Sequence, residues 1–219
     1  MIEVFDCAQN SEEWFMCRLG LPTASMFDAV LAKGKGGAES LTRSRYLRTL
    51  AAEIITGAPG EQFTTPAMER GKAMESDARN LYAFAHDIEP QLVGFIKNGA
   101  KGCSPDALIG DAGMAEIKTR RGDLMIETLL RDEMPPEHKA QVQGAMWVAE
   151  REWLDFIAFW PGLPLFVSRQ YRDEPYITTL AGEVARFNDE LAAIVDRVRR
   201  YGMPPKEMVR DQLLRSAAQ

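Results

Sequence analysis

Residues 103–118, CSPDALIGDAGMAEIK, contain the pattern that decides the fold of this chain. The apolar run 107–109 and the segment 114–118 flank residues 110–113, whose glycines and aspartate are typical of a hairpin turn. In a strand, side chains i and i+2 point to the same face about 6 to 7 Å apart, so Glu116 and Lys118 share a face. The fold-back also brings Asp106 alongside Glu116. The stretch therefore predicts two paired strands that gather two carboxylates and an amine.

Asp106 and Glu116 predict a site for a hard divalent cation. Two carboxylates held together at neutral pH repel each other unless a cation lies between them. Oxygen ligands favour Mg²⁺ or Mn²⁺ over zinc. Lys118 beside such a site can orient or deprotonate an attacking water, or neutralise charge that develops on a phosphate. Since an exposed hairpin can carry these common residue types by accident, the pattern needs support from the rest of the chain.

Composition favours one domain over residues 1–219, because 219 residues with 46% hydrophobic and 26% charged suit a substantial core. We expect a cytoplasmic protein without membrane association, since no signal pattern and no apolar run of membrane length occurs. The cysteines Cys7, Cys17 and Cys103 are odd in number and widely spaced, which favours reduced thiols. His86 and His138 are too few and too far apart to predict a histidine metal site, so both are expected to be structural.

The periodicity of the chain predicts alternating helices and strands. Helices are expected over residues 26–32, about 40–56 with Gly57 at the end, 66–86, 137–149 and about 179–201. Strands are expected near residues 92–97, 107–109, 114–118, 153–160 and 165–171. Residues 119–135 are expected to be mostly irregular, and the tail 211–219 to be frayed. This order predicts an α/β fold with a central mixed sheet flanked by helices on both faces.

Two polar side chains are expected to point inward from helices. Glu75 shares a stripe with Ala78 and Tyr82, a small and apolar face on which an acid is costly unless it meets a cation or water bound there. Gln141 shares a face with Val148, so its amide needs a partner. For Gln141 a purely structural hydrogen bond is the alternative to a role in a site.

Six segments of the chain resemble, in the same order, those of the lambda-exonuclease family, the YqaJ-type viral recombinases of the PD-(D/E)xK nuclease superfamily. The segments are WFMCRLG (14–20), PTAS (22–25), GKAMESDAR (71–79), CSPD (103–106), EIK (116–118) and AQVQ (140–143). The resemblance covers roughly residues 10–160. It implies a restriction-endonuclease-like topology for the α/β core.

The resemblance also implies roles for individual residues. Asp106, Glu116 and the backbone carbonyl of Ile117 would hold Mg²⁺, with Mn²⁺ as an alternative and Asp106 bridging toward a second ion. The attacking water would be arranged by Lys118, Glu75 and Gln141. The terminal 5′-phosphate would be held by Arg18, Ser25 and Ser104, since a guanidinium and hydroxyls are suitable donors.

The function implied by the resemblance is a Mg²⁺-dependent 5′-to-3′ exonuclease. It would digest one strand of linear double-stranded DNA from a 5′-phosphorylated end and leave 3′ overhangs for phage-type single-strand-annealing recombination. A homotrimeric ring and a phage single-strand-annealing partner, in a bacterial host cell, are implied as well. Two alternatives stay open: an endonuclease or junction resolvase of the same superfamily, and a non-catalytic module that binds DNA ends.

The formal net charge of -6 does not exclude DNA as a partner, because net charge is an average over the surface. Basic residues concentrate in one stretch, at Lys33, Lys35, Arg43, Arg45 and Arg48. As a group they predict a DNA-facing edge, whereas each one alone fits a solvated helix face equally well.

Overall fold

The computed structural model describes residues 1–60 and 66–203, so the predicted frayed tail at 211–219 lies outside the described residues. The strands are β1 (Ile2–Phe5), β2 (Phe95–Asn98), β3 (Gly102–Cys103), β4 (Ala107–Ile109), β5 (Gly113–Thr119), β6 (Trp153–Phe159) and β7 (Phe166–Tyr171). The α-helices are α1 (Glu12–Cys17), α2 (Phe27–Leu31), α3 (Leu41–Thr56), α4 (Pro66–His86), α5 (Gly122–Arg131), α6 (Lys139–Ala149) and α7 (Glu174–Arg199). Short 3₁₀ turns are η1 (Ala24–Met26), η2 (Lys35–Gly37) and η3 (Pro136–His138).

The central sheet has the strand order β4-β5-β6-β7. Strand β5 pairs antiparallel with β4 and parallel with β6, and β7 closes the sheet antiparallel to β6. The parallel pair needs a crossover, and α5 and α6 supply it between β5 and β6. The predicted α/β class with a mixed central sheet is therefore confirmed.

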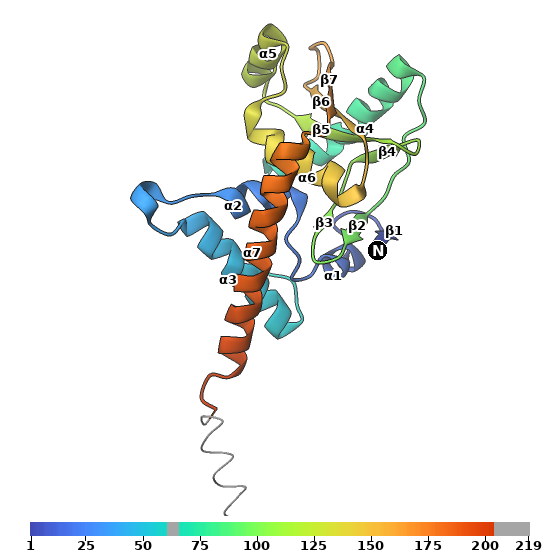
Figure 1. Cartoon of the computed structure of the whole chain (residues 1–219). Helices are drawn as coiled ribbons and strands as arrows, with labels where there is room; N and C mark the ends of the chain where they lie inside the picture. The colour runs from blue at the N-terminus through green and yellow to red at the C-terminus, as the bar shows by residue number, and fades with distance from the viewer. Residues whose placement is uncertain (61–65, 204–219) are drawn as a thin grey trace, which may run out of the picture.

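Helices cover both faces of this sheet (Figure 1). Because side chains alternate along a strand, Met114 of β5 joins the large apolar core formed with α2, α3, α6 and α7. Ala115 and Ile117 point the other way and pack with Ala78 and Tyr82 of α4 in a second apolar cluster. Glu116 and Lys118 have the parity of Met114, so they lie on the α6 face of the sheet.

A second sheet, with the order β1-β2-β3, carries the N-terminus. The sequence did not predict β1 or α1, and the strand expected at residues 92–97 begins only at Phe95. The expectation of an irregular stretch over residues 119–135 is wrong, because α5 forms there and buries Met125 and Thr128. Met125, Thr128 and Leu129 are spaced by three and four residues, which is the spacing of one face of a helix.

The remaining helices agree closely with expectation. Gly57 ends α3 in the left-handed region at φ 70°, where glycine carries no steric penalty. Helix α7 begins at Glu174, earlier than expected, because Asp173 caps it through the amide of Tyr176. In Figure 1 the long helix α7 (orange) runs beside α3, and its buried stripe is core. Among residues 1–60 and 66–203, we find no helix with the length and apolarity to cross a membrane.

Candidate functional site

The hairpin β4–β5 brings together the predicted carboxylates and lysine. The amide of Asp106 donates to the carbonyl of Ala115, at 3.2 Å, and the amide of Ile117 donates to Oδ2 of Asp106, at 2.5 Å. Glu116 is only 4% exposed, and its Oε1 lies 2.6 Å from Nζ of Lys118. Gln141 of α6 donates through Nε2 to the same Oε1, at 2.5 Å. The backbone pairing of one hairpin and one turn of α6 therefore position these side chains.

The charges of this cluster act strongly on one another. Burial raises the pKa of Asp106 well above its usual range, and the carboxylates of Glu116 and Glu75 raise it further. Burial alone lowers the pKa of Lys118, but the same acidic neighbours outweigh it, so the net shift is upward. Lys118 is therefore an ammonium at neutral pH. Three acidic groups, Asp106, Glu116 and Glu75, therefore lie close to one another, an arrangement that a bound cation would relieve.

The donor set fits a hard divalent cation. None of the described side chains donates a hydrogen bond to Oδ1 of Asp106 or Oε2 of Glu116, although both residues line a cavity. Carboxylate oxygens are the ligands that Mg²⁺ and Mn²⁺ prefer. Within residues 1–60 and 66–203, no three His, Cys, Asp or Glu side chains are already grouped as metal ligands. The two carboxylates would thus need further oxygen donors, such as a backbone carbonyl.

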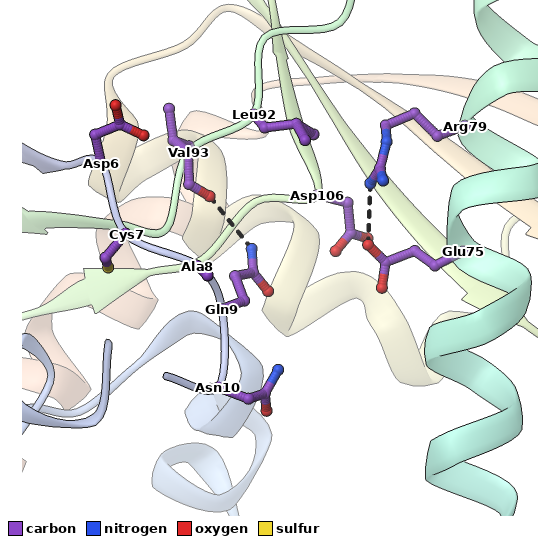
Figure 2. Close-up of a pocket in the computed structure, with 10 residues that line it drawn as sticks. All are labelled: Asp6, Cys7, Ala8, Gln9, Asn10, Glu75, Arg79, Leu92, Val93 and Asp106. Carbon is purple, nitrogen blue, oxygen red and sulfur yellow. Dashed lines mark hydrogen bonds and ion pairs between the residues drawn. The ribbon is translucent and has the colours of Figure 1, made fainter. Parts of the chain in front are cut away.

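Glu75 approaches the cluster from the opposite side of the sheet edge. Figure 2 shows the carboxylates of Glu75 and Asp106 pointing toward one another, and both residues line the same cavity. The predicted stripe of α4 is confirmed, since Ala78 and Tyr82 are buried. Arg79, one turn later, donates to Oε1 of Glu75 at 3.1 Å and keeps that carboxylate paired.

The three side chains predicted to hold a 5′-phosphate share a cavity with the acidic cluster. The cavity has a volume of about 190 Å³ and is lined by Arg18, Ser25 and Ser104, and by Asp106 and Glu116. Its donors are therefore next to the carboxylates. A phosphate held by a guanidinium and two hydroxyls would place the adjoining nucleotide at the cluster.

Trp14 holds two of these donors in place, a role that the sequence did not reveal. The guanidinium of Arg18 lies over the Trp14 ring, at 4.0 Å from its centroid. The Trp14 Nε1–H donates to Oγ of Ser104, at 2.8 Å, and to the carbonyl of Gly94, at 3.0 Å. Thr23 links Arg18 to Ser25, because its Oγ1 accepts a hydrogen bond from Arg18 and lies 3.3 Å from Oγ of Ser25. The signal was present, since Trp14 and Thr23 lie in the motifs that contain Arg18 and Ser25.

His138 is a further neighbour of Lys118. Its ring stacks on Phe156, with 5.0 Å between centroids, and its Nε2 lies 3.0 Å from Nη1 of Arg120. Because arginine only donates, Nε2 accepts and the imidazole is neutral. Burial lowers the pKa of His138 to about 4, and Lys118 and Arg120 contribute. His138 therefore stays neutral beside Lys118, and its contacts with Phe156 and Arg120 fit the structural role expected for it.

The predicted basic edge is only partly present. Lys33, Lys35, Arg45 and Arg48 are exposed. Arg43 instead binds both oxygens of Glu190 on α7 and lies over the ring of Phe187. Its side chain is 15% exposed, so Arg43 belongs to the contact between α3 and α7, unlike the four exposed basic residues. Only some positions of a helix face a neighbouring helix, and the sequence alone does not show which arginine of α3 faces α7.

Comparisons with known proteins agree with the motifs. Residues 13–152 match the YqaJ-like viral recombinase domain. The crystal structure of LHK-Exo in complex with dAMP has 33% identity and a TM-score of 0.80, over 87% of this chain and 97% of that one. The structure titled as an alkaline exonuclease, LHK-Exo, from Laribacter hongkongensis has the same identity and coverage, with a TM-score of 0.79.

A more distant structure supports the fold alone. It is a phage-related exonuclease from Haemophilus somnus, with 13% identity and a TM-score of 0.62, over 81% of this chain and 96% of that one. Among curated proteins no match is found.

Proposed function

Because the chain belongs to the YqaJ-like viral recombinase family, as its motifs predicted, we propose that it is a DNA exonuclease that starts at a 5′-phosphorylated end. It degrades one strand of linear duplex DNA in the 5′-to-3′ direction and leaves a 3′ overhang. The reaction hydrolyses phosphodiester bonds and depends on Mg²⁺ or Mn²⁺, since nucleases of this kind generally use divalent metal ions.

One observation carries this proposal: the end-phosphate donors and the acidic cluster line the same cavity. Arg18 and Ser104 lie on the cavity wall together with Asp106, Glu116 and Gln141. A volume of about 190 Å³ leaves room for a strand terminus but not for continuous duplex. An endonuclease needs no donors for a terminal phosphate beside its catalytic acids. A module that only binds ends needs no buried Glu116 next to an ammonium.

The residues of the cavity divide the work. Asp106, Glu116 and the backbone carbonyl of Ile117 would hold the divalent cations, two Mg²⁺ ions in this proposal. Bound there, divalent cations would stabilise the attacking and leaving oxygens as Lewis acids. Lys118 orients the attacking water and offsets charge on the phosphate, while Gln141 keeps Glu116 in place through Oε1. The carboxylate of Glu75 points toward Asp106 and would accept a hydrogen bond from the attacking water.

Assembly into a homotrimeric ring and cooperation with a single-strand-annealing protein belong to the same proposal. An encircling protein does not leave DNA between cuts, which suits stepwise removal of nucleotides. Exposed apolar side chains on α5, at Leu124, Ile126 and Leu130, give a surface for such contacts.

The test compares three substrates of identical sequence: linear duplex with 5′-phosphate, linear duplex with 5′-hydroxyl, and covalently closed circles. We expect Mg²⁺-dependent release of mononucleotides from 5′-labelled linear DNA, faster from phosphorylated ends, and none from circles. Cutting of circles would instead identify an endonuclease. Binding of ends without release under any divalent cation would identify a non-catalytic module.

A further inference from the structure

We propose that the cavity between the N-terminal loop and α4 receives the base and sugar of the second nucleotide, on the 3′ side of the bond that is cut. This inference rests on the proposed function. The cavity has a volume of about 440 Å³. Figure 2 shows it between residues 6–10 and 92–93 on one side and Glu75 and Arg79 of α4 on the other.

The cavity continues the path of a strand through the site. Asp106 and Gln9 line it, and the same two residues line the smaller cavity that contains Arg18 and Ser104. The two cavities therefore adjoin at Asp106 and Gln9. With the terminal phosphate at Arg18 and the bond to be cut at Asp106, the next nucleotide lies beyond Asp106. That position is the larger cavity.

The wall opposite α4 is firmly built. Gln9 donates through Nε2 to the carbonyls of Pro105, at 3.0 Å, and Val93, at 3.4 Å. The amide of Gly94 donates to the carbonyl of Phe5, at 3.0 Å. A Cβ at Gly94 would lie 2.2 Å from the carbonyl oxygen of Cys7, so only glycine allows this close approach. The loop is thus attached to the residue that directly precedes Asp106, and the cavity keeps its shape relative to the acidic cluster.

The chemistry of the lining suits a base and a sugar. Leu92 is 57% exposed, and with the buried Val93 it offers an apolar surface against which a base can pack. The side-chain amide of Asn10 can hydrogen-bond to a base edge or a sugar oxygen. The acids Asp6, Glu75 and Asp106 outnumber the one cation, Arg79, in this lining, so an isolated phosphate is disfavoured. A cavity of about 440 Å³ lies in the range of nucleotide-sized ligand sites.

The test removes the base from one nucleotide at a time and the side chain from Leu92. Three 5′-phosphorylated duplexes are compared in single-turnover assays of the first cut, with Mg²⁺: intact, abasic at nucleotide 1, and abasic at nucleotide 2. In the unaltered protein we expect the abasic site at nucleotide 2 to slow the first cut by roughly tenfold, the size expected when one apolar contact is lost. Leu92→Ala should slow the intact duplex by a similar factor and show no further loss with the abasic site at nucleotide 2.

Two controls make this outcome specific. The abasic site at nucleotide 1 should slow the Leu92→Ala variant by the same factor as the unaltered protein, because that base lies in the other cavity. Phe84→Ala, which removes an 89% exposed apolar side chain from α4 outside the cavity, should keep the full response at nucleotide 2. Equal effects of the second abasic site on the unaltered protein and on Leu92→Ala would overturn the inference, and so would no effect on the unaltered protein. If the intact duplex is not digested at all, it is the proposed function that fails.

Discussion

The hydroxyl of Tyr82 on α4 donates a hydrogen bond to the buried carboxylate of Asp155 on β6. Arg169 of β7 binds the same carboxylate with Nε and Nη2, both at 2.8 Å. Burial raises the pKa of Tyr82, and Asp155 raises it further, so the phenol keeps its proton and remains a donor. Glu75 lies two helical turns before Tyr82 on the same face of α4. This contact therefore sets the position of α4 on the sheet and, with it, the position of Glu75.

Tyr82→Phe removes the hydroxyl without changing the packing of the ring. We expect the free energy of unfolding to fall by about 1.5–3 kcal/mol, the usual size for a hydrogen bond to a charged group. Urea unfolding followed by circular dichroism measures it. Tyr171→Phe, at a 67% exposed tyrosine, is the matched control and should change little. Equal stabilities of the Tyr82→Phe variant and the unaltered protein would show that water replaces the hydroxyl.

Lys118→Ala should abolish strand removal, by about 10²-fold or more, because an ammonium at the reacting phosphate acts mainly on the transition state. Release of mononucleotides from 5′-labelled duplex with Mg²⁺ measures the rate. The fold should persist, since Gln141 still donates a hydrogen bond to Glu116 after the lysine side chain is removed.

Lys97→Ala serves as the matched control for Lys118. Lys97 also pairs with a glutamate, Glu3, at 3.2 Å, but it lies on β2 in the other sheet. Its loss should leave digestion unchanged. Digestion by purified Lys118→Ala at the rate of the Lys97→Ala variant would contradict the role given to Lys118.

The hairpin that carries the acidic cluster was predictable because its determinants are local. Residues 110–113 supply the turn, and the period of two in β5 places Glu116 and Lys118 on one face. The turn also sets the register of β4 against β5, in which Ala107 lies opposite Ala115. Helix α4 was equally visible from its stripe, and with it the inward position of Glu75.

The N-terminal wall of the site was not predictable for the opposite reason. Gln9 bonds to carbonyls of Val93 and Pro105, which are 84 and 96 residues away in sequence. No local pattern encodes such pairs. The same holds for Arg43 and Arg45, which differ only in the side of α3 from which they project, so that one meets Glu190 and the other meets solvent.

His138→Gln should make the protein less sensitive to acid. The pKa of His138 is lowered to about 4 in the folded state, from an ordinary 6.5, so the unfolded chain takes up the proton first as pH falls. The stability that the neutral ring contributes is therefore full above pH 6.5 and is lost between pH 6.5 and 4. Glutamine keeps an acceptor for Arg120 but has no charge to gain.

Thermal unfolding at pH 7 and at pH 4.5 measures this difference. The unaltered protein should lose more stability over this interval than the His138→Gln variant, by at most about 3 kcal/mol. His86→Gln is the control, because His86 is exposed at the end of α4. Parallel pH profiles for His138→Gln and the unaltered protein would show that the ring does not stay neutral in the folded state.

Arg43→Ala should weaken the fold and leave DNA binding unchanged. The guanidinium is largely buried against Phe187, whereas Glu190 is 40% exposed, so we expect a loss of about 1–2 kcal/mol after allowing for solvent screening. Urea unfolding and the affinity for duplex ends in Ca²⁺ measure the two properties. Arg45→Ala, at the exposed neighbour, should weaken the affinity for duplex ends and leave the free energy of unfolding unchanged. If Arg43→Ala weakens the affinity for duplex ends and leaves the stability unchanged, Arg43 contacts DNA as the sequence predicted.

Arg18→Ala should reduce the preference for phosphorylated ends rather than the reaction itself. The guanidinium lies over Trp14 and can bind a terminal phosphate with a charge-assisted hydrogen bond, worth about 1.5–3 kcal/mol, or roughly 10- to 100-fold in rate. The measurement is the ratio of initial rates on 5′-phosphate and 5′-hydroxyl duplexes, because a folding defect lowers both rates equally and leaves the ratio unchanged. Arg18→Lys should keep part of the ratio, since an ammonium retains the charge but not the planar fork. Arg48→Ala, at an exposed arginine of α3, should keep all of it. A ratio for Arg18→Ala equal to that of Arg48→Ala would mean that the terminal phosphate lies elsewhere, and that the order of the two cavities along the strand must be reversed.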